Sequence, residues 1–122
     1  LLRRALALGL DPALPARDSI EPLRHALGHA ATRPTAMAWL SEHIEGLAAR
    51  APKEQVGSWP TWVDGACSRE DRARFVALFE ARAARLDAGP RAYRQSLERI
   101  DHCLALRAAQ EAPLNAFLAN AS

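Results

Sequence analysis

The sequence is poor in the residues that favour β-strands and rich in those that favour helices. Valine, isoleucine and threonine together contribute 9 of the 122 residues, whereas alanine contributes 27 and leucine 17. Alanine and leucine cost least in a helix, and β-branched side chains fit better on a pleated sheet. The composition therefore excludes a sheet protein and predicts an all-α chain of one domain, residues 1–122.

Several chemical signatures are also missing. No run of residues approaches the ~20 apolar positions that a membrane-spanning helix needs. The sequence has no glycine-rich phosphate loop, no Ser-His-Asp arrangement and no paired-carboxylate motif. We therefore expect no membrane span and no catalytic residue, so this chain alone is not predicted to be an enzyme.

Lysine is nearly absent, and this affects which partners are expected. The basic residues are 15 arginines and 1 lysine against 14 acidic residues, which gives a net charge of +2. Acidic and basic residues alternate along most of the chain, whereas nucleic-acid-binding domains usually cluster their positive charge. Non-specific DNA binding is the least favoured alternative, and we expect no nucleic-acid partner.

Only two cysteines are present, Cys67 and Cys103. They form neither a disulfide framework nor a spaced metal motif, so we expect both to be reduced, small apolar packing residues. His102 precedes Cys103, but neighbouring helical residues point about 100° apart. The pair is therefore not predicted to be a nucleophile and its base.

His25 and His29 are four residues apart, which places both rings on one face of a helix, as in some zinc sites. The intervening residues are Ala-Leu-Gly, so the glutamate of a His-Glu-x-x-His motif is missing. No third ligand has a diagnostic spacing. We predict two ordinary histidines at a partly exposed packing surface, with no metal and no cofactor bound by this chain.

Apolar residues at helical spacing divide the chain into short helices. The predicted helical segments are 1–8, 18–31, 32–51, 53–65, 68–86, 89–110 and 113–118. Asp18 is predicted to cap the second, with Glu21 completing a capping box, and Ser68 caps the fifth. Gly9 is expected to end the first helix, Gly89-Pro90 to separate the fifth from the sixth, and Pro113 to begin a short last helix.

These six or seven helices are joined by short connectors, which favour antiparallel neighbours. The expected architecture is a set of antiparallel helical hairpins stacked as a HEAT- or armadillo-like α-α superhelix. A compact helical bundle is the alternative. The stripe in 68–86 includes Phe75, Phe79 and Leu86, and Trp59 and Trp62 are predicted to anchor packing in 53–65.

Two of the predicted helices carry many arginines. They are Arg69, Arg72, Arg74, Arg82 and Arg85 in one, and Arg91, Arg94, Arg99 and Arg107 in the next. The favoured interpretation is a solvated face with ion pairs to nearby acids. The functional alternative is that some of these side chains meet the carboxylates of a peptide.

Four stretches, in order, resemble helices near the end of aminopeptidase-N-like zinc metallopeptidases, the family of the puromycin-sensitive and endoplasmic-reticulum aminopeptidases. They are residues 17–20 (RDSI), 37–47 (MAWLSEHIEGL), 67–79 (from Cys67-Ser68 to Phe79) and 91–100 (RAYRQSLERI). The chain departs from the family pattern at Cys103, at Leu106 and in the Trp-Pro-Thr-Trp segment 59–62. These departures leave the subfamily open.

The resemblance implies a non-catalytic, C-terminal, HEAT-like domain of a larger zinc aminopeptidase. Such a domain covers the catalytic domain and helps to enclose the peptide-binding chamber, so its partners would be that domain and the peptide substrate. The zinc ligands and the catalytic motifs of the family would lie upstream, and none of them matches a residue here. The alternative is a free-standing helical module that binds a protein or peptide. These residues do not define the compartment.

Overall fold

Helices account for all the regular secondary structure in residues 1–85 and 89–121, the residues that the computed structural model describes. The elements are α1 (Leu2–Ala7), η1 (Leu8–Leu10), α2 (Ala16–Ser19), α3 (Glu21–Leu27), α4 (Arg33–Arg50), α5 (Lys53–Ser58), η2 (Trp59–Trp62), α6 (Arg69–Ala83) and α7 (Gly89–Ala121), where η marks a 3₁₀ helix. The prediction of an all-α chain is confirmed for these residues. None of their helices has the length and apolar character needed to cross a membrane.

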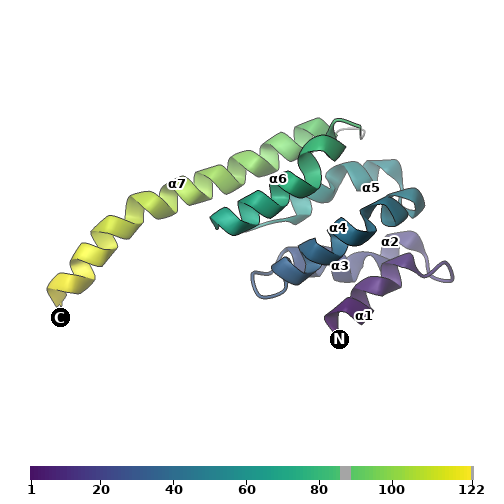
Figure 1. The fold of residues 1–122 in the computed structure, drawn as a ribbon, viewed down its shortest axis with the longest axis horizontal. Coiled ribbons are helices and arrows are strands. Elements are labelled where there is room, and N and C mark those ends of the chain that lie inside the picture. The colour runs from purple at the N-terminus through teal and green to yellow at the C-terminus, as the bar shows by residue number, and fades with distance from the viewer. Residues whose placement is uncertain (86–88, 122) are drawn as a thin grey trace.

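The longer helices form two antiparallel pairs, α3 with α4 and α6 with α7 (Figure 1). Helix α4 contacts α1 and α3 and also α6, so it joins the two pairs. Helix α5 and η2 pack against α7. Only the first part of α7 lies over the other helices, and its C-terminal part projects away from them (Figure 1).

One apolar core holds these helices together. It includes Leu27 and Leu40 from the first pair, Phe75 from the second, and Trp59, each of which is fully buried. Trp62 is buried beside Trp59, with the two ring centroids 6.1 Å apart. The prediction that these tryptophans anchor the segment 53–65 is confirmed.

Helix α6 begins as the sequence predicts. The side chain of Ser68 accepts a hydrogen bond of 3.0 Å from the backbone N–H of Asp71. This bond satisfies one of the N–H groups that the first turn of a helix leaves unpaired. Leu86, predicted to continue the apolar stripe of this helix, lies outside the described residues.

The predicted helix 18–31 is wrong in both its start and its end. Asp18 does not cap a helix; it lies inside α2, and α3 begins after Ile20 without a side-chain cap. Pro22 has no N–H to bond back into the preceding turn, so the two helices are separate. Helix α3 then ends at Leu27, and the Thr32 hydroxyl donates to the carbonyl of Ala26 across the turn that follows.

Two connections differ from the prediction in smaller ways. Gly9 does not end the first helical segment, because η1 extends it to Leu10. Segment 53–65 is divided between α5 and η2 and ends in a turn in which Gly65 has φ of +78°. A residue with a Cβ is strained at that φ, so glycine is required there.

The expectation that Pro113 begins a short last helix is also wrong. Helix α7 runs without interruption from Gly89 to Ala121, with Pro113 inside it. A proline within a helix removes one hydrogen bond and bends the axis, but it does not always end the helix. The C-terminal part of α7 curves away from its first part in Figure 1.

Candidate interaction site

A disulfide joins α7 to the start of α6. Cys67 and Cys103 are bonded to each other, with their Cα atoms 5.5 Å apart. The prediction that both thiols are reduced is therefore wrong. The antiparallel pairing of α6 and α7 brings together two positions 36 residues apart in the sequence. Because the sulfur of Cys103 is committed to this bond, it is no free nucleophile beside His102.

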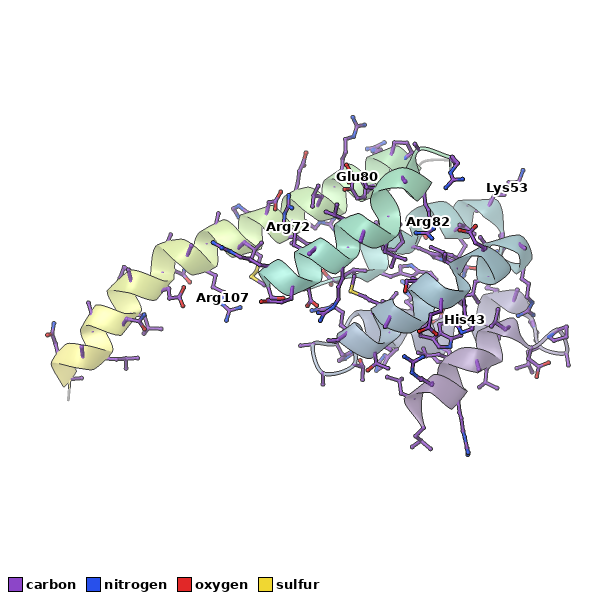
Figure 2. All side chains as sticks on the ribbon, viewed as in Figure 1. His43, Lys53, Arg72, Glu80, Arg82 and Arg107 are labelled. Atoms are coloured by element: carbon purple, nitrogen blue, oxygen red, sulfur yellow. A yellow bond between two sulfur atoms is a disulfide. The ribbon has the colours of Figure 1, made fainter. Side chains whose placement is uncertain are left out.

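Four of the arginines on α6 and α7 have partners within the chain. Arg72 binds Asp101 at 2.5 Å, Arg74 binds Asp71 at 3.0 Å, and Arg82 binds Glu45 at 3.2 Å. The hydrogen bond from Arg72 to Asp101, and then the charge of Asp101, raise the pKa of the Arg72 guanidinium. Figure 2 shows Arg72 and Arg82, both of which lie on α6.

The fourth of these arginines, Arg107, lies close to the disulfide. Its guanidinium donates to the backbone carbonyl of Cys67 at 3.0 Å (Figure 2). This contact ties α7 to the start of α6 at the point where α7 leaves the other helices. For Arg72, Arg74 and Arg82 the favoured interpretation, ion pairs to nearby acids, is confirmed. Arg107 instead donates to a backbone carbonyl.

The two histidines of α3 and the turn after it lie side by side on the surface. The ring centroids of His25 and His29 are 4.3 Å apart, and Nδ1 of His29 is 2.7 Å from the carbonyl oxygen of His25. Within residues 1–85 and 89–121, no group of three or more His, Cys, Asp or Glu side chains is placed to hold a metal ion. Both histidines are exposed.

A hollow of about 350 Å³ lies between α7 and the segment after η2, and we call it the α7 hollow. Its residues include Val63, Ala66, Ser96, Ile100, Cys103 and Leu106. Arg99 and His102 also line it, and both are exposed. Ser96 is only 4% exposed, and its Oγ has no hydrogen-bond partner in the described part of the chain.

The C-terminal part of α7 is exposed at every described position from residue 105 onward, and we call residues 105–121 the overhang. It carries unusually large apolar side chains for a surface. Leu106 is 49% exposed, Leu114 55% and Phe117 68%. Single exposed apolar residues are common, but several on one projecting helix indicate a surface that contacts something else.

The hollow and the overhang share one side of α7. Cys103, Leu106, Gln110, Pro113 and Phe117 follow one another at intervals of three and four residues, which places them in one row along a helix. The first two line the hollow and the last is the most exposed aromatic of the overhang. We call this row the α7 flank; it is the candidate interaction site.

Sequence reasoning missed this flank because it ended the helix before Pro113. That prediction places Phe117 in a separate helix, so it does not show that Phe117 is aligned with Leu106. The signal that was present is the three-four spacing itself, which continues through the proline. The position of Ser96 in the hollow has no comparable sequence signal.

Comparison with protein-family models, with curated proteins and with solved structures found no match to this chain.

Proposed function

We propose that the chain is the non-catalytic C-terminal helical domain of a zinc aminopeptidase of the aminopeptidase-N-like family. The observation that carries this proposal is the ordered resemblance of several stretches to the helices of that domain. Residues 37–47 lie in α4, Ser68 to Phe79 in α6, and 91–100 in α7. These three helices pack in succession, α4 on α6 and α6 on α7, which supports reading the stretches as parts of one domain.

In this proposal the helical hairpins stack as a HEAT-like superhelix against the catalytic domain and help to enclose the peptide-binding chamber. The exposed arginines of α7, such as Arg99, are available to the carboxylates of a peptide. The role of the domain is to position and admit the peptide, and the reaction takes place on the upstream domain.

The residues of this chain do not fit the zinc site of such an enzyme. His25 and His29 have the spacing of two ligands, but Nδ1 of His29 is directed to the His25 carbonyl and no third ligand joins them among the described residues. A catalytic zinc needs three protein ligands and an open position. In the proposed enzyme the metal is held by the upstream catalytic domain.

The first test is to read the coding sequence upstream of Leu1. The proposal expects a continuous reading frame that encodes His-Glu-x-x-His, whereas an independent start codon would overturn it. The second test is the parent enzyme with and without residues 1–122. We expect the shortened enzyme to retain zinc and hydrolysis of a single-residue chromogenic substrate, but to lose its discrimination between short and long peptides.

The isolated chain provides the control. Supplied with zinc, it should release no amino acid from a peptide, because the described residues contain no complete metal site and the sequence contains no catalytic motif. Robust turnover by the isolated chain would contradict the proposal.

A free-standing helical interaction module is the second candidate function. The observation that favours it is the α7 flank, which presents Leu106 and Phe117 to the surroundings. An independent start codon directly before Leu1 would support this candidate and exclude the first.

A further inference from the structure

The Cys67–Cys103 disulfide lies at the place where α7 leaves the other helices (Figure 2). Ile100, one turn before Cys103, is the last buried side chain of α7 and is only 2% exposed. Cys103 and Leu104 are half-buried, and every described position of the overhang is exposed. The bond therefore joins the start of α6 to α7 at the edge of the apolar core.

The noncovalent contacts around this bond are weak. In the ion pair between Arg72 and Asp101, the two side chains are 40% and 49% exposed, and exposed pairs contribute little to stability. Arg107 donates to the backbone carbonyl of Cys67, so this contact depends on where Cys67 lies. Leu104 adds a partly buried apolar contact with the core. The disulfide is therefore the strongest of these constraints on α7 beyond Ile100.

The part of α7 beyond Ile100 is a poor helix without such a constraint. Pro113 cannot donate a backbone hydrogen bond, and it divides this part into residues 101–112 and 113–121. Isolated helices shorter than about 12–15 residues are marginal in water, even when they are rich in alanine. Because the overhang has no buried position among residues 105–121, its order depends on the contacts made by residues 101–107.

The disulfide is accessible in the folded chain. Both cysteines are half-buried, not fully buried. Cys103 lines the α7 hollow, and Cys67 lines a second hollow of about 370 Å³ between the start of α6 and α7. Thiol–disulfide exchange requires a thiolate to reach one of the two sulfur atoms, and exposed disulfides are the more readily reduced ones. A reductant can therefore approach this bond without unfolding the core.

We propose that the Cys67–Cys103 disulfide is a redox-sensitive switch that controls the order of the overhang, and that a dithiol reductant opens it. A thiolate of the dithiol attacks one sulfur atom and displaces the other as a thiolate, and the second thiol of the reductant then closes a disulfide within the reductant. Two electrons and two protons pass to the chain, so both cysteines end as thiols. This inference does not rest on the aminopeptidase assignment, and either can fail without the other.

Opening the switch changes the α7 flank, the candidate interaction site. Cys103 and Leu106 form part of the wall of the α7 hollow, whereas Val63 and Ile100, which also line it, are buried in the core. When the part of α7 beyond Ile100 is released, Leu106 and Phe117 lose their fixed positions and the core side of the hollow stays in place. The flank is therefore one continuous row only in the oxidised chain.

The experiment is amide ¹⁵N relaxation of the 122-residue chain in native buffer, first oxidised and then reduced with dithiothreitol. In the oxidised chain we expect order parameters of about 0.85 for residues 101–112, the value of a rigid backbone. After reduction, the order parameters of residues 105–112 should fall below about 0.6, whereas those of α4 and of residues 91–100 should not change. Oxidised glutathione should restore the first set of values, because a switch must be reversible.

The rate of reduction tests the accessibility of the bond. Dithiothreitol should reduce it in native buffer, and urea well below the unfolding midpoint should not change the rate. A bond that is reached only through global unfolding would instead be reduced faster as urea lowers the stability, and this result would overturn the proposal.

Two variants provide the controls. Cys67→Ala/Cys103→Ala should have the low order parameters of the reduced chain and should not respond to dithiothreitol. Arg107→Gln keeps the disulfide but removes the contact with the Cys67 carbonyl, so its overhang should stay ordered while it is oxidised. The proposal is overturned if reduction leaves residues 105–112 unchanged, if it lowers the order parameters of α4 as well, as the loss of a purely structural bond would, or if Arg107→Gln alone releases the overhang.

Discussion

The guanidinium of Arg33 and the carboxylate of Asp71 form a buried ion pair that joins the starts of α4 and α6. Their Nη1 and Oδ2 atoms are 3.3 Å apart, and the two side chains are 4% and 12% exposed. Arg33 also donates to the backbone carbonyls of Leu27 and Asp64. One side chain therefore connects α3, α4, α6 and the turn after η2.

Replacing Arg33 by methionine should destabilise the fold strongly. The change leaves the Asp71 carboxylate with Arg74 alone and two backbone carbonyls without their donor, and breaking a buried pair typically costs about 3–5 kcal/mol. We expect the free energy of unfolding to fall by that amount in a urea titration. The native helix content should be kept at low urea if enough stability remains.

The exposed ion pair between Arg3 and Glu42 offers the matched control. Its atoms are 3.5 Å apart, but both side chains are more than half exposed, so Arg3→Met should cost less than about 1 kcal/mol. The double variant Arg33→Met/Asp71→Leu removes both buried charges and should recover part of the loss. Equal effects of Arg33→Met and Arg3→Met would contradict the structural role given to Arg33.

Reduction of the Cys67–Cys103 disulfide should also lower stability. The bond closes a loop with a sequence separation of 36 residues, and the chain-entropy relation gives about 4 kcal/mol for a loop of that size. We expect a dithiol reductant to lower the midpoint of urea unfolding. The variant Cys67→Ala/Cys103→Ala should have the lower urea midpoint from the start, and the reductant should not change it. If the reductant lowered the midpoint of this variant, the loss of stability would not come from the Cys67–Cys103 bond.

The Ser68 cap gives a smaller and more local prediction. Ser68→Ala removes the acceptor of the Asp71 N–H, which should lower the free energy of unfolding by about 1 kcal/mol. Ser41 is the matched control, since it is exposed in the middle of α4 and its hydroxyl only donates to the Ala38 carbonyl in its own helix. Ser41→Ala should have no effect or a slight stabilising one, because alanine is the better helix former. Similar losses for both serines would argue against the cap.

The parts of the fold that could be predicted from the sequence depend on local signals. Helix α6 was found from Ser68 and its apolar stripe, and the burial of Trp59 and Trp62 followed from their size. The identity of each partner across the fold could not be found in this way. Arg33 has no sequence feature that separates it from the surface arginines, and its burial is a property of how α3, α4 and α6 meet.

The candidate site was hidden for similar reasons. The pairing of Cys67 with Cys103 depends on the register of α6 against α7, which two cysteines alone do not specify. Pro113 was expected to start a helix because prolines prefer first turns, yet here the exposed helix tolerates it with a bend. Because the predicted helix ended before Pro113, Leu106 and Phe117 fell in different predicted helices. The row that they share on α7 was therefore not predicted.

Tyr93 should titrate above the ordinary tyrosine value. It stacks on Phe75 with ring centroids 5.4 Å apart and planes 3° from parallel. Burial raises the pKa of the Tyr93 hydroxyl, the charge of Glu80 raises it further, and Arg72 opposes them. The sequence contains 1 tyrosine, so the ultraviolet absorbance of tyrosinate reports this residue alone. The midpoint should lie above about 10 in the folded chain and near it in urea.

The same shift lowers stability at alkaline pH. Below about pH 10, Tyr93 is neutral in both states and its titration does not change the free energy of unfolding. As the pH rises further, the Tyr93 hydroxyl ionises first in the unfolded chain, which favours the unfolded state. The free energy of unfolding therefore falls until the pH passes the pKa of Tyr93 in the folded chain. Glu80→Gln should bring the folded midpoint closer to the unfolded one, whereas Arg72→Gln should move it higher. Identical midpoints in the folded and the urea-unfolded chain would contradict the burial of Tyr93 against Phe75.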